Sequence, residues 1–216
     1  MLDLPVECTA MTRDDRAASA HPVLAWLRRE ALPLAVMLLL LGAARDTLAN
    51  HYQVPSGSMQ PTLQPGDHVV VDMRAYGLRL PFTGIRLLDT GHPQRGDVAV
   101  FDSPADGTRL IKRVVAVAGD RVELHDGHLR INGRALGGAP QQETFGAKQV
   151  LLDLDAGGGP DIDGLVIPEG RLLVLGDHRG NSLDGRYFGL VDADTVYGKA
   201  RAVFWRRGEG MQWRAL

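Results

Sequence analysis

Cysteine is almost absent from this chain: of its 216 residues only Cys8 carries a thiol. A single thiol near the N-terminus excludes an internal disulfide, and it argues against a cysteine nucleophile or a cysteine-based metal site in the rest of the chain. The chain must therefore fold without a covalent cross-link, which a domain of this length can do by burying a hydrophobic core.

Charge imbalance and metal-binding motifs are missing as well. Lysine and arginine together number 24 against 26 acidic residues, so nothing points to nucleic acid. The seven histidines form no H-E-x-x-H motif, and the pairs His125/His128 and His68/His92 lack supporting ligands nearby in the sequence. We expect no nucleic-acid partner, no metal and no cofactor.

Aromatic residues are few, at 6%, whereas glycines number 26. Many glycines between short Val/Leu-rich runs are typical of strands joined by turns. The predicted strands cover residues 68–73, 97–101, 109–118, 121–124, 128–132, 171–175 and 196–205. No amphipathic helix is evident after residue 50, so the predicted fold is mainly β, an antiparallel β-sheet domain with a loop-rich β insertion at residues 133–170.

One apolar run interrupts this pattern, at residues 31–44 (ALPLAVMLLLLGAA). The run is short for a membrane span, which needs about 20 residues, but charged flanking side chains can reach the interface. We predict one N-terminal transmembrane helix at residues 28–49. A cleaved signal peptide and a buried core helix are the alternatives, although some thirty residues before the run argue against an ordinary signal peptide.

The distribution of arginines gives this span an orientation. Four arginines precede it (Arg13, Arg16, Arg28 and Arg29), and only Arg45 follows closely. Positive charge stays on the cytoplasmic side. Residues 1–27 are therefore predicted to be a cytoplasmic tail, and residues 50–216 an extracytoplasmic domain.

Lys112 is the first candidate for chemistry. On a strand it shares one face with Leu110, Val114 and Ala116, so its ammonium group is poorly solvated. Desolvation lowers the pKa of a lysine, and a neutral lysine can act as a general base. The alternative is an edge-strand lysine whose charged end extends to water.

Ser58 is the second candidate, in the segment Pro55-Ser56-Gly57-Ser58-Met59. A serine beside glycine on a proline-constrained loop allows close approach of a substrate, as a nucleophile requires. The alternative is a simple linker. The sequence contains neither G-x-S-x-G nor S-x-x-K, so an α/β-hydrolase elbow and the penicillin-binding arrangement are not indicated.

A polar, glycine-rich stretch at residues 175–189 (LGDHRGNSLDGRYFG) is the third candidate. Loops dense in hydrogen-bonding groups often support a site, although a solvated surface loop is the alternative. His178 raises the further possibility of a Ser-His-Asp triad with Ser58.

Four segments in order resemble the bacterial type I signal peptidase (leader peptidase), a family of serine proteases with a Ser-Lys dyad. They are Ser56-Gly57-Ser58-Met59-Gln60-Pro61-Thr62-Leu63, Gln94-Arg95-Gly96-Asp97-Val98-Ala99-Val100-Phe101, Ile111-Lys112-Arg113-Val114-Val115 with Ala118-Gly119-Asp120, and residues 176–189. The similarity runs from about residue 45 to Trp205.

The resemblance implies a role for each matching position. Ser58 would be the nucleophile and Lys112 the general base. Ser56 would donate to the oxyanion, and Ser182 would hold the lysine amine. Asp184 and Arg186 would pair, and Asp177 and Arg179 would support the loop. The residues implied to line substrate subsites are Val54, Pro55, Met59, Leu110 and Ile111.

The resemblance also implies the substrates and the cellular location. The substrates would be exported preproteins, cut after small residues such as alanine, at the outer side of the bacterial inner (plasma) membrane, with the lipid bilayer as a second partner. Alternatives are a specialised pilin or conjugation peptidase and a non-catalytic membrane-tethered binding protein. A C-terminal group would either contact lipid or form core; it comprises Phe204, Trp205, Trp213, Arg206, Arg207 and Arg214.

Overall fold

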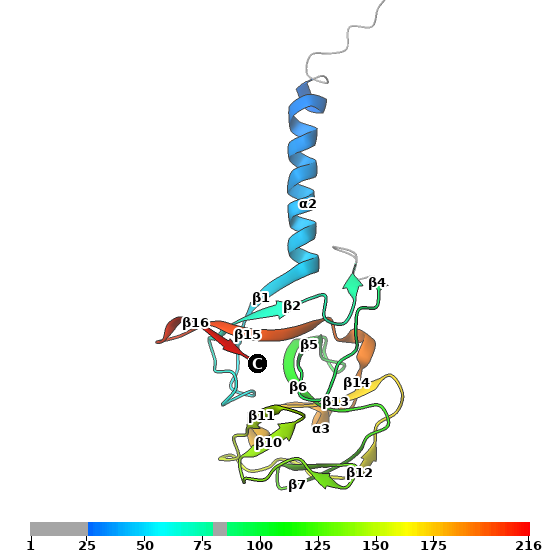
Figure 1. The fold of residues 1–216 in the computed structure, drawn as a ribbon, viewed down its shortest axis with the longest axis vertical. Helices are drawn as coiled ribbons and strands as arrows, with labels where there is room; N and C mark the ends of the chain where they lie inside the picture. Colours follow the sequence, from blue (N-terminus) through cyan, green and yellow to red (C-terminus); the bar gives the residue numbers. More distant parts are fainter. Residues whose placement is uncertain (1–25, 80–85) are drawn as a thin grey trace, which may run out of the picture. The chain divides into compact units, whose positions relative to one another are not determined.

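The computed structural model describes residues 26–79 and 86–216 (Figure 1). The chain divides into two compact units, residues 1–41 and 42–216. The predicted cytoplasmic tail, residues 1–27, lies almost wholly outside the described residues.

The predicted span at residues 28–49 is helical over most of its length. A five-residue π-helix, η1 (Leu27–Ala31), is followed by the 17-residue helix α2 (Leu32–Leu48). Leucine and alanine favour helix, and Pro33 is tolerated because it lies in the first turn of α2. Within residues 26–79 and 86–216, no helix combines the length and apolarity that crossing a membrane requires.

The second unit is built on one antiparallel sheet in the order β1-β2-β15-β5-β6-β13-β14, with β16 paired to β15 (Figure 1). Its strands are β1 (Ala49–Gln53), β2 (His68–Asp72), β5 (Val98–Asp102), β6 (Arg109–Val117), β13 (Arg171–Leu175), β14 (Val191–Asp192), β15 (Gly198–Arg206) and β16 (Gly210–Ala215). In β2 the side chains alternate between buried and half-buried, as a strand with one covered face requires. Strand β6 is buried from Lys112 to Ala116, and its residues join two different core clusters, Val114 one and Val115 with Ala116 the other.

A smaller group of strands follows β6 and lies at the far end of this unit from β1 and β16 (Figure 1). A four-stranded sheet joins β12 (Ile162–Val166), β7 (Arg121–His125), β8 (His128–Ile131) and β9 (Arg134–Ala135), and β10 (Gln142–Phe145) pairs with β11 (Lys148–Leu151). Asp126 and Gly127 both have positive φ, which is the type I′ turn expected between β7 and β8. The segment predicted to be loop-rich thus contains four strands, β9 to β12.

The remaining elements are short. They are the hairpin of β3 (Leu78–Arg79) and β4 (Arg86–Leu88), the 3₁₀ turns η2 (Arg179–Asn181) and η3 (Ala193–Thr195), and the one-turn helix α3 (Gly185–Phe188). The prediction of a mainly β, antiparallel fold is confirmed.

The core fixes the segment between β1 and β2 against the sheet. Val54, Met59 and Leu63 pack in one buried cluster with Val69 of β2 and Val100 of β5. The two ends of the segment are hydrogen-bonded to each other: Val54 N donates to Asp67 O (2.8 Å), and Gly66 N donates to Val54 O (2.8 Å). The loop that carries Ser58 is therefore a packed part of the core.

The two alternatives for the C-terminal group apply to different members of it. Arg206 does not face a lipid interface, because its side chain is only 4% exposed and forms a bidentate pair with buried Asp67 (2.9 and 2.6 Å). Trp213 on β16 is 70% exposed, as a contact with lipid would require.

Candidate active site

Ser58 lies in the turn that follows β1, and its side chain is almost fully buried. Its Oγ atom lies 3.3 Å from Oγ of Ser56, which is exposed. Its carbonyl oxygen accepts a hydrogen bond from the backbone N–H of His178 (3.2 Å). Gly176 is required beside it, since a Cβ at that position would collide with the Ser58 carbonyl and with the Ser182 hydroxyl.

Lys112 reaches Ser58 from β6. Its Nζ atom is hydrogen-bonded to Ser58 Oγ at 2.5 Å, and its side chain is buried. Burial lowers the pKa of Lys112 from 10.5 to about 8, while the charges of Asp184 and Asp177 oppose that shift. Roughly a tenth of the amine is therefore neutral at pH 7 and can accept the proton of the serine hydroxyl.

Asp177 anchors the polar loop to the same strand. Arg113, the neighbour of Lys112, points to the other side of β6 and binds both carboxylate oxygens of Asp177 (2.8 and 2.7 Å). Thr62 Oγ1 donates to Asp177 Oδ2 (2.5 Å), which links the loop to the segment that carries Ser58. The fork geometry of arginine makes this pair rigid as well as charged.

Two more buried ion pairs complete the support. Arg186 binds Asp184 through Nε and Nη2 (both 2.8 Å), and Asp184 Oδ2 also accepts from Gly176 N (2.9 Å). Arg179 binds Glu143 of β10 (3.1 and 2.5 Å) and donates to the Gly127 carbonyl. The loop is therefore fixed both to the active-site sheet and to the smaller group of strands.

Ser182 and His178 are buried without side-chain hydrogen bonds within the described residues. The Ser182 hydroxyl makes no bond to Lys112, although it lies close to Gly176. The imidazole of His178 makes none to Ser58, and it faces Asp153 and Asp155 instead. The geometry thus favours Lys112 over His178 as the base next to Ser58.

An apolar cavity of about 150 Å³ lies between the end of β1 and the start of β6. It is lined by Tyr52, Gln53, Val54, Pro55, Val69, Val100, Arg109, Leu110 and Ile111. Four of the five predicted subsite residues are among them. The fifth, Met59, is not: it is fully buried and packs in the core with Val54 and Leu63. A larger hollow of about 700 Å³ is lined by neither Ser58 nor Lys112.

Sequence reasoning missed two charged residues of the site, Arg113 and Glu143. A signal for Arg113 was available, because a second cation in an otherwise apolar strand needs a buried partner. Glu143 offered no local signal, since its partner Arg179 is 36 residues away.

Comparison with known proteins places the chain in a family. It matches the family described as signal peptidase, peptidase S26, over residues 27–205. The signal peptidase I of Pseudomonas fluorescens is 34% identical over 211 residues, which covers 85% of this chain and 73% of that protein. The signal peptidase I of Pseudomonas aeruginosa is 34% identical over 212 residues, with the same coverage.

A third relative and a solved structure extend the comparison. Signal peptidase IB of Staphylococcus aureus is 30% identical over 197 residues, covering 85% of this chain and 90% of that protein. A crystal structure of a signal peptidase I from Enterococcus faecalis is 33% identical and covers 50% of this chain and 97% of that one, with a TM-score of 0.37. The chain belongs to the signal peptidase family, peptidase S26, and is a serine peptidase.

Proposed function

We propose that this chain removes signal peptides from exported preproteins at the outer face of the bacterial plasma membrane, with Ser58 as nucleophile and Lys112 as general base. The observation that carries the assignment of roles is the 2.5 Å contact between Lys112 Nζ and Ser58 Oγ inside a buried setting. Neither residue would be reactive alone, since a serine hydroxyl needs a base and a lysine must first lose its proton.

The reaction follows from this geometry. Neutral Lys112 takes the proton of Ser58 as Oγ attacks the scissile carbonyl, and it then passes the proton to the leaving amine. The hydroxyl of Ser56, 3.3 Å from Ser58 Oγ, is suited to stabilise the oxyanion together with the Ser58 N–H. Each such donor contributes about 2.7–4 kcal/mol. Lys112 activates water in the second half of the reaction.

A free strand edge offers a binding place for an extended substrate. Strand β6 pairs with β13 only from Arg113 onward, so its first residues have β5 on one side and, within the described part of the chain, no strand on the other. An extended peptide can add to such an edge through main-chain hydrogen bonds. The adjoining apolar cavity of about 150 Å³ suits a small side chain.

Residues 28–49 are proposed to be the membrane anchor, with residues 1–27 in the cytoplasm and residues 50–216 outside. Support comes from helix α2, whose described leucine side chains are about half exposed or more. A continuous exposed apolar surface of this kind marks a contact with lipid or with another protein.

The test is cleavage of a synthetic preprotein peptide with an Ala-x-Ala site, in detergent, with the products identified by mass spectrometry. We expect wild-type protein to cut after the second alanine. Ser58→Ala and Lys112→Ala should both be inactive although folded. Their melting curves would establish that they are folded.

The outcomes separate the alternatives. If folded wild-type protein cuts no such peptide, the substrate assignment fails. If Lys112→Ala retains activity, the base is wrongly assigned, and His178→Ala becomes the variant to measure.

A further inference from the structure

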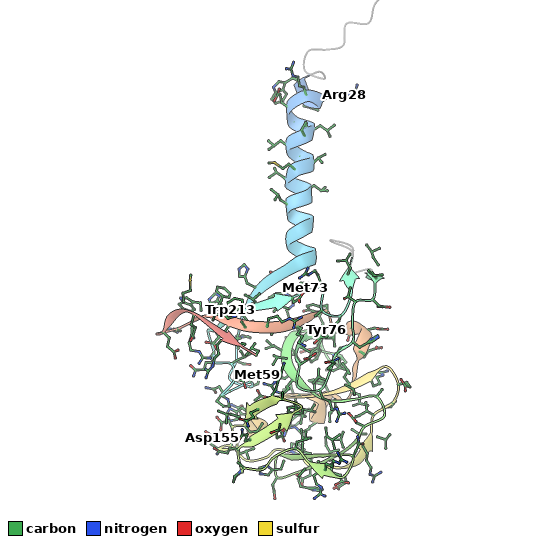
Figure 2. All side chains as sticks on the ribbon, viewed as in Figure 1. Arg28, Met59, Met73, Tyr76, Asp155 and Trp213 are labelled. Carbon is green, nitrogen blue, oxygen red and sulfur yellow. The ribbon has the colours of Figure 1, made fainter. Side chains whose placement is uncertain are left out.

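Three side chains that the peptidase mechanism does not use converge beside the active-site loop. Asp153 and Asp155 lie in the segment between β11 and β12, and His178 lies directly before η2. One nitrogen or oxygen atom from each lies within 4.8 Å of the others. Asp155 lies at the outer surface of the smaller group of strands (Figure 2).

The backbone holds this cluster in place. Asp153 and His178 form a parallel β-bridge. Asp153 N donates to Asp177 O (2.9 Å), and Arg179 N donates to Asp153 O (3.0 Å). The two segments are therefore fixed to each other before any side chain contributes.

His178 supplies an independent observation. Its side chain is only 9% exposed, and neither ring nitrogen has a hydrogen-bond partner within the described residues. Nδ1 nevertheless lies 3.9 Å from Asp153 Oδ2, and Nε2 lies 3.0 Å from Asp155 Oδ1. A buried polar group without a partner is costly, so an imidazole placed between two carboxylates in this way requires an explanation.

We propose that Asp153, Asp155 and His178 bind a divalent cation of the Zn²⁺ type. Imidazole and carboxylate are both zinc ligands, whereas Mg²⁺ and Ca²⁺ prefer oxygen alone. Two carboxylates and a neutral imidazole balance the charge of the ion. The Asp155 side chain is 74% exposed, which gives the ion a path from solvent and leaves room for water as a fourth ligand.

The bound ion would fasten the smaller group of strands to the nucleophile segment. The backbone N–H of His178 donates to the carbonyl of Ser58. An ion bound by the His178 side chain would therefore be connected to the proposed nucleophile residue through one backbone hydrogen bond. The role of the site is structural: it stabilises the folded chain and takes no part in proton transfer.

A second histidine provides a matched control. His125 also lies between two carboxylates, 3.6 Å from Asp161 and 3.5 Å from Asp163, but all three side chains are half exposed or more. Water satisfies those groups, so we expect no comparable binding there.

The experiment uses the full chain in detergent, stripped with EDTA and exchanged into metal-free buffer, in a Cys8→Ser background so that no thiol competes for zinc. Isothermal titration with ZnCl₂ should give one site per chain. At a Zn²⁺ concentration of about 100 times Kd, the melting temperature should rise by roughly 5 to 10 °C. Asp155→Asn and His178→Asn should each weaken binding by about tenfold or more, and His125→Asn should not.

Asp155→Asn is the decisive variant because its exposed side chain can change without disturbing the core. Its melting temperature in EDTA should equal that of wild type, while the zinc-dependent rise should be lost. The proposal is overturned if wild type binds no Zn²⁺, or if Asp155→Asn and His178→Asn bind it as wild type does. The cluster would then be an ion pair of a protonated His178 with the two carboxylates.

Discussion

At the scale of single residues, the proposed role of Lys112 as a general base depends on its burial in β6. The strand carries an amine into a buried position where desolvation is the largest influence, and the pKa falls to about 8. At pH 7 roughly a tenth of the chains would then hold Lys112 neutral, against fewer than about one in a thousand at the usual lysine pKa. Burial thus makes the amine usable as a base.

The pH dependence of cleavage follows directly. We expect kcat/KM for the Ala-x-Ala peptide to rise about tenfold per pH unit below pH 8 and to level off above it, because only neutral Lys112 can accept the proton of Ser58. Initial rates between pH 6 and 10 would measure this. A flat profile over that range, with the absence of a burst showing that no step after acylation limits the rate, would exclude Lys112 as the base.

The same burial should reduce stability. Lys112 has a lower pKa in the folded chain (about 8) than in the unfolded chain (10.5), so the folded state holds fewer protons between those values and stability rises with pH across that window. Below pH 8 the folded state carries a desolvated charge, which costs up to about 3 kcal/mol.

Lys112→Met should therefore be inactive yet more stable than wild type at pH 7, by roughly 1–3 kcal/mol, as often occurs when a strained active site is relieved. Urea unfolding at pH 7 and pH 10 measures this, and the advantage should shrink at pH 10. A variant less stable than wild type at pH 7 would contradict the expectation.

At the scale of elements, buried ion pairs hold the active-site loop. Arg113 with Asp177 fixes its start to β6, and Arg179 with Glu143 fixes it to β10. Breaking such a pair by removing one partner leaves an uncompensated buried charge. The rigidity of the loop, and with it the position of the Ser58 carbonyl, depends on these pairs.

Glu143→Gln tests this arrangement. The variant leaves Arg179 buried without its counter-charge, and we expect a loss of about 3–5 kcal/mol in the free energy of unfolding together with lower activity. Glu123→Gln is the matched control, since the Glu123 side chain is about a third exposed, contacts Arg130 at 3.7 Å and Arg121 at 4.0 Å, and should change stability by less than about 0.5 kcal/mol. Equal losses in the free energy of unfolding of the two variants would mean that Glu143 does not hold the active-site loop in place.

Which elements were predictable depends on how local their signal is. β2, β5, β6 and β13 are rich in valine and leucine, and β15 contains the apolar run Ala202-Val203-Phe204-Trp205; the sequence predicts each of these strands within a few residues. β1 (ANHYQ) and β16 (GMQWRA) carry little such pattern, and they are strands because β2 and β15 offer them backbone partners. Partners of that kind are visible only once the sheet is assembled.

At the scale of the whole molecule, the contact between Ser58 and Lys112 depends on the order of the strands in the main sheet. Ser58 follows β1 and Lys112 lies on β6, and the order β1-β2-β15-β5-β6 separates those strands by three others. The contact across 54 residues exists because the loop after β1 packs back over the sheet through Val54, Met59 and Leu63. The four matching segments identify the participants by resemblance, but the path of the loop over the sheet cannot be read from periodicity.

We expect peptidase activity to reside in residues 42–216, because the proposed nucleophile Ser58 and the proposed base Lys112 both lie in that unit. A variant that begins at Gly42 retains β1 and its pairing with β2, so the loop that carries Ser58 stays closed at both ends. We expect kcat/KM for a short Ala-x-Ala peptide in detergent to stay within about threefold of the full chain, because the peptide reaches β6 and the adjoining cavity without residues 1–41.

The matched control begins at Val54 and lacks β1. It removes one strand from the edge of the sheet and exposes the backbone of β2, so we expect it to aggregate or to lose most of its activity.

Flotation with liposomes gives the second measurement. The full chain should float with the vesicles, and the variant that begins at Gly42 should do so far less, because it lacks most of the apolar run at residues 31–44. If the Gly42 variant is folded but inactive on the short peptide, residues 1–41 belong to the active site as well as to the proposed anchor. If it floats as the full chain does, attachment to lipid depends on the second unit, and the exposed Trp213 is the first side chain to replace with alanine.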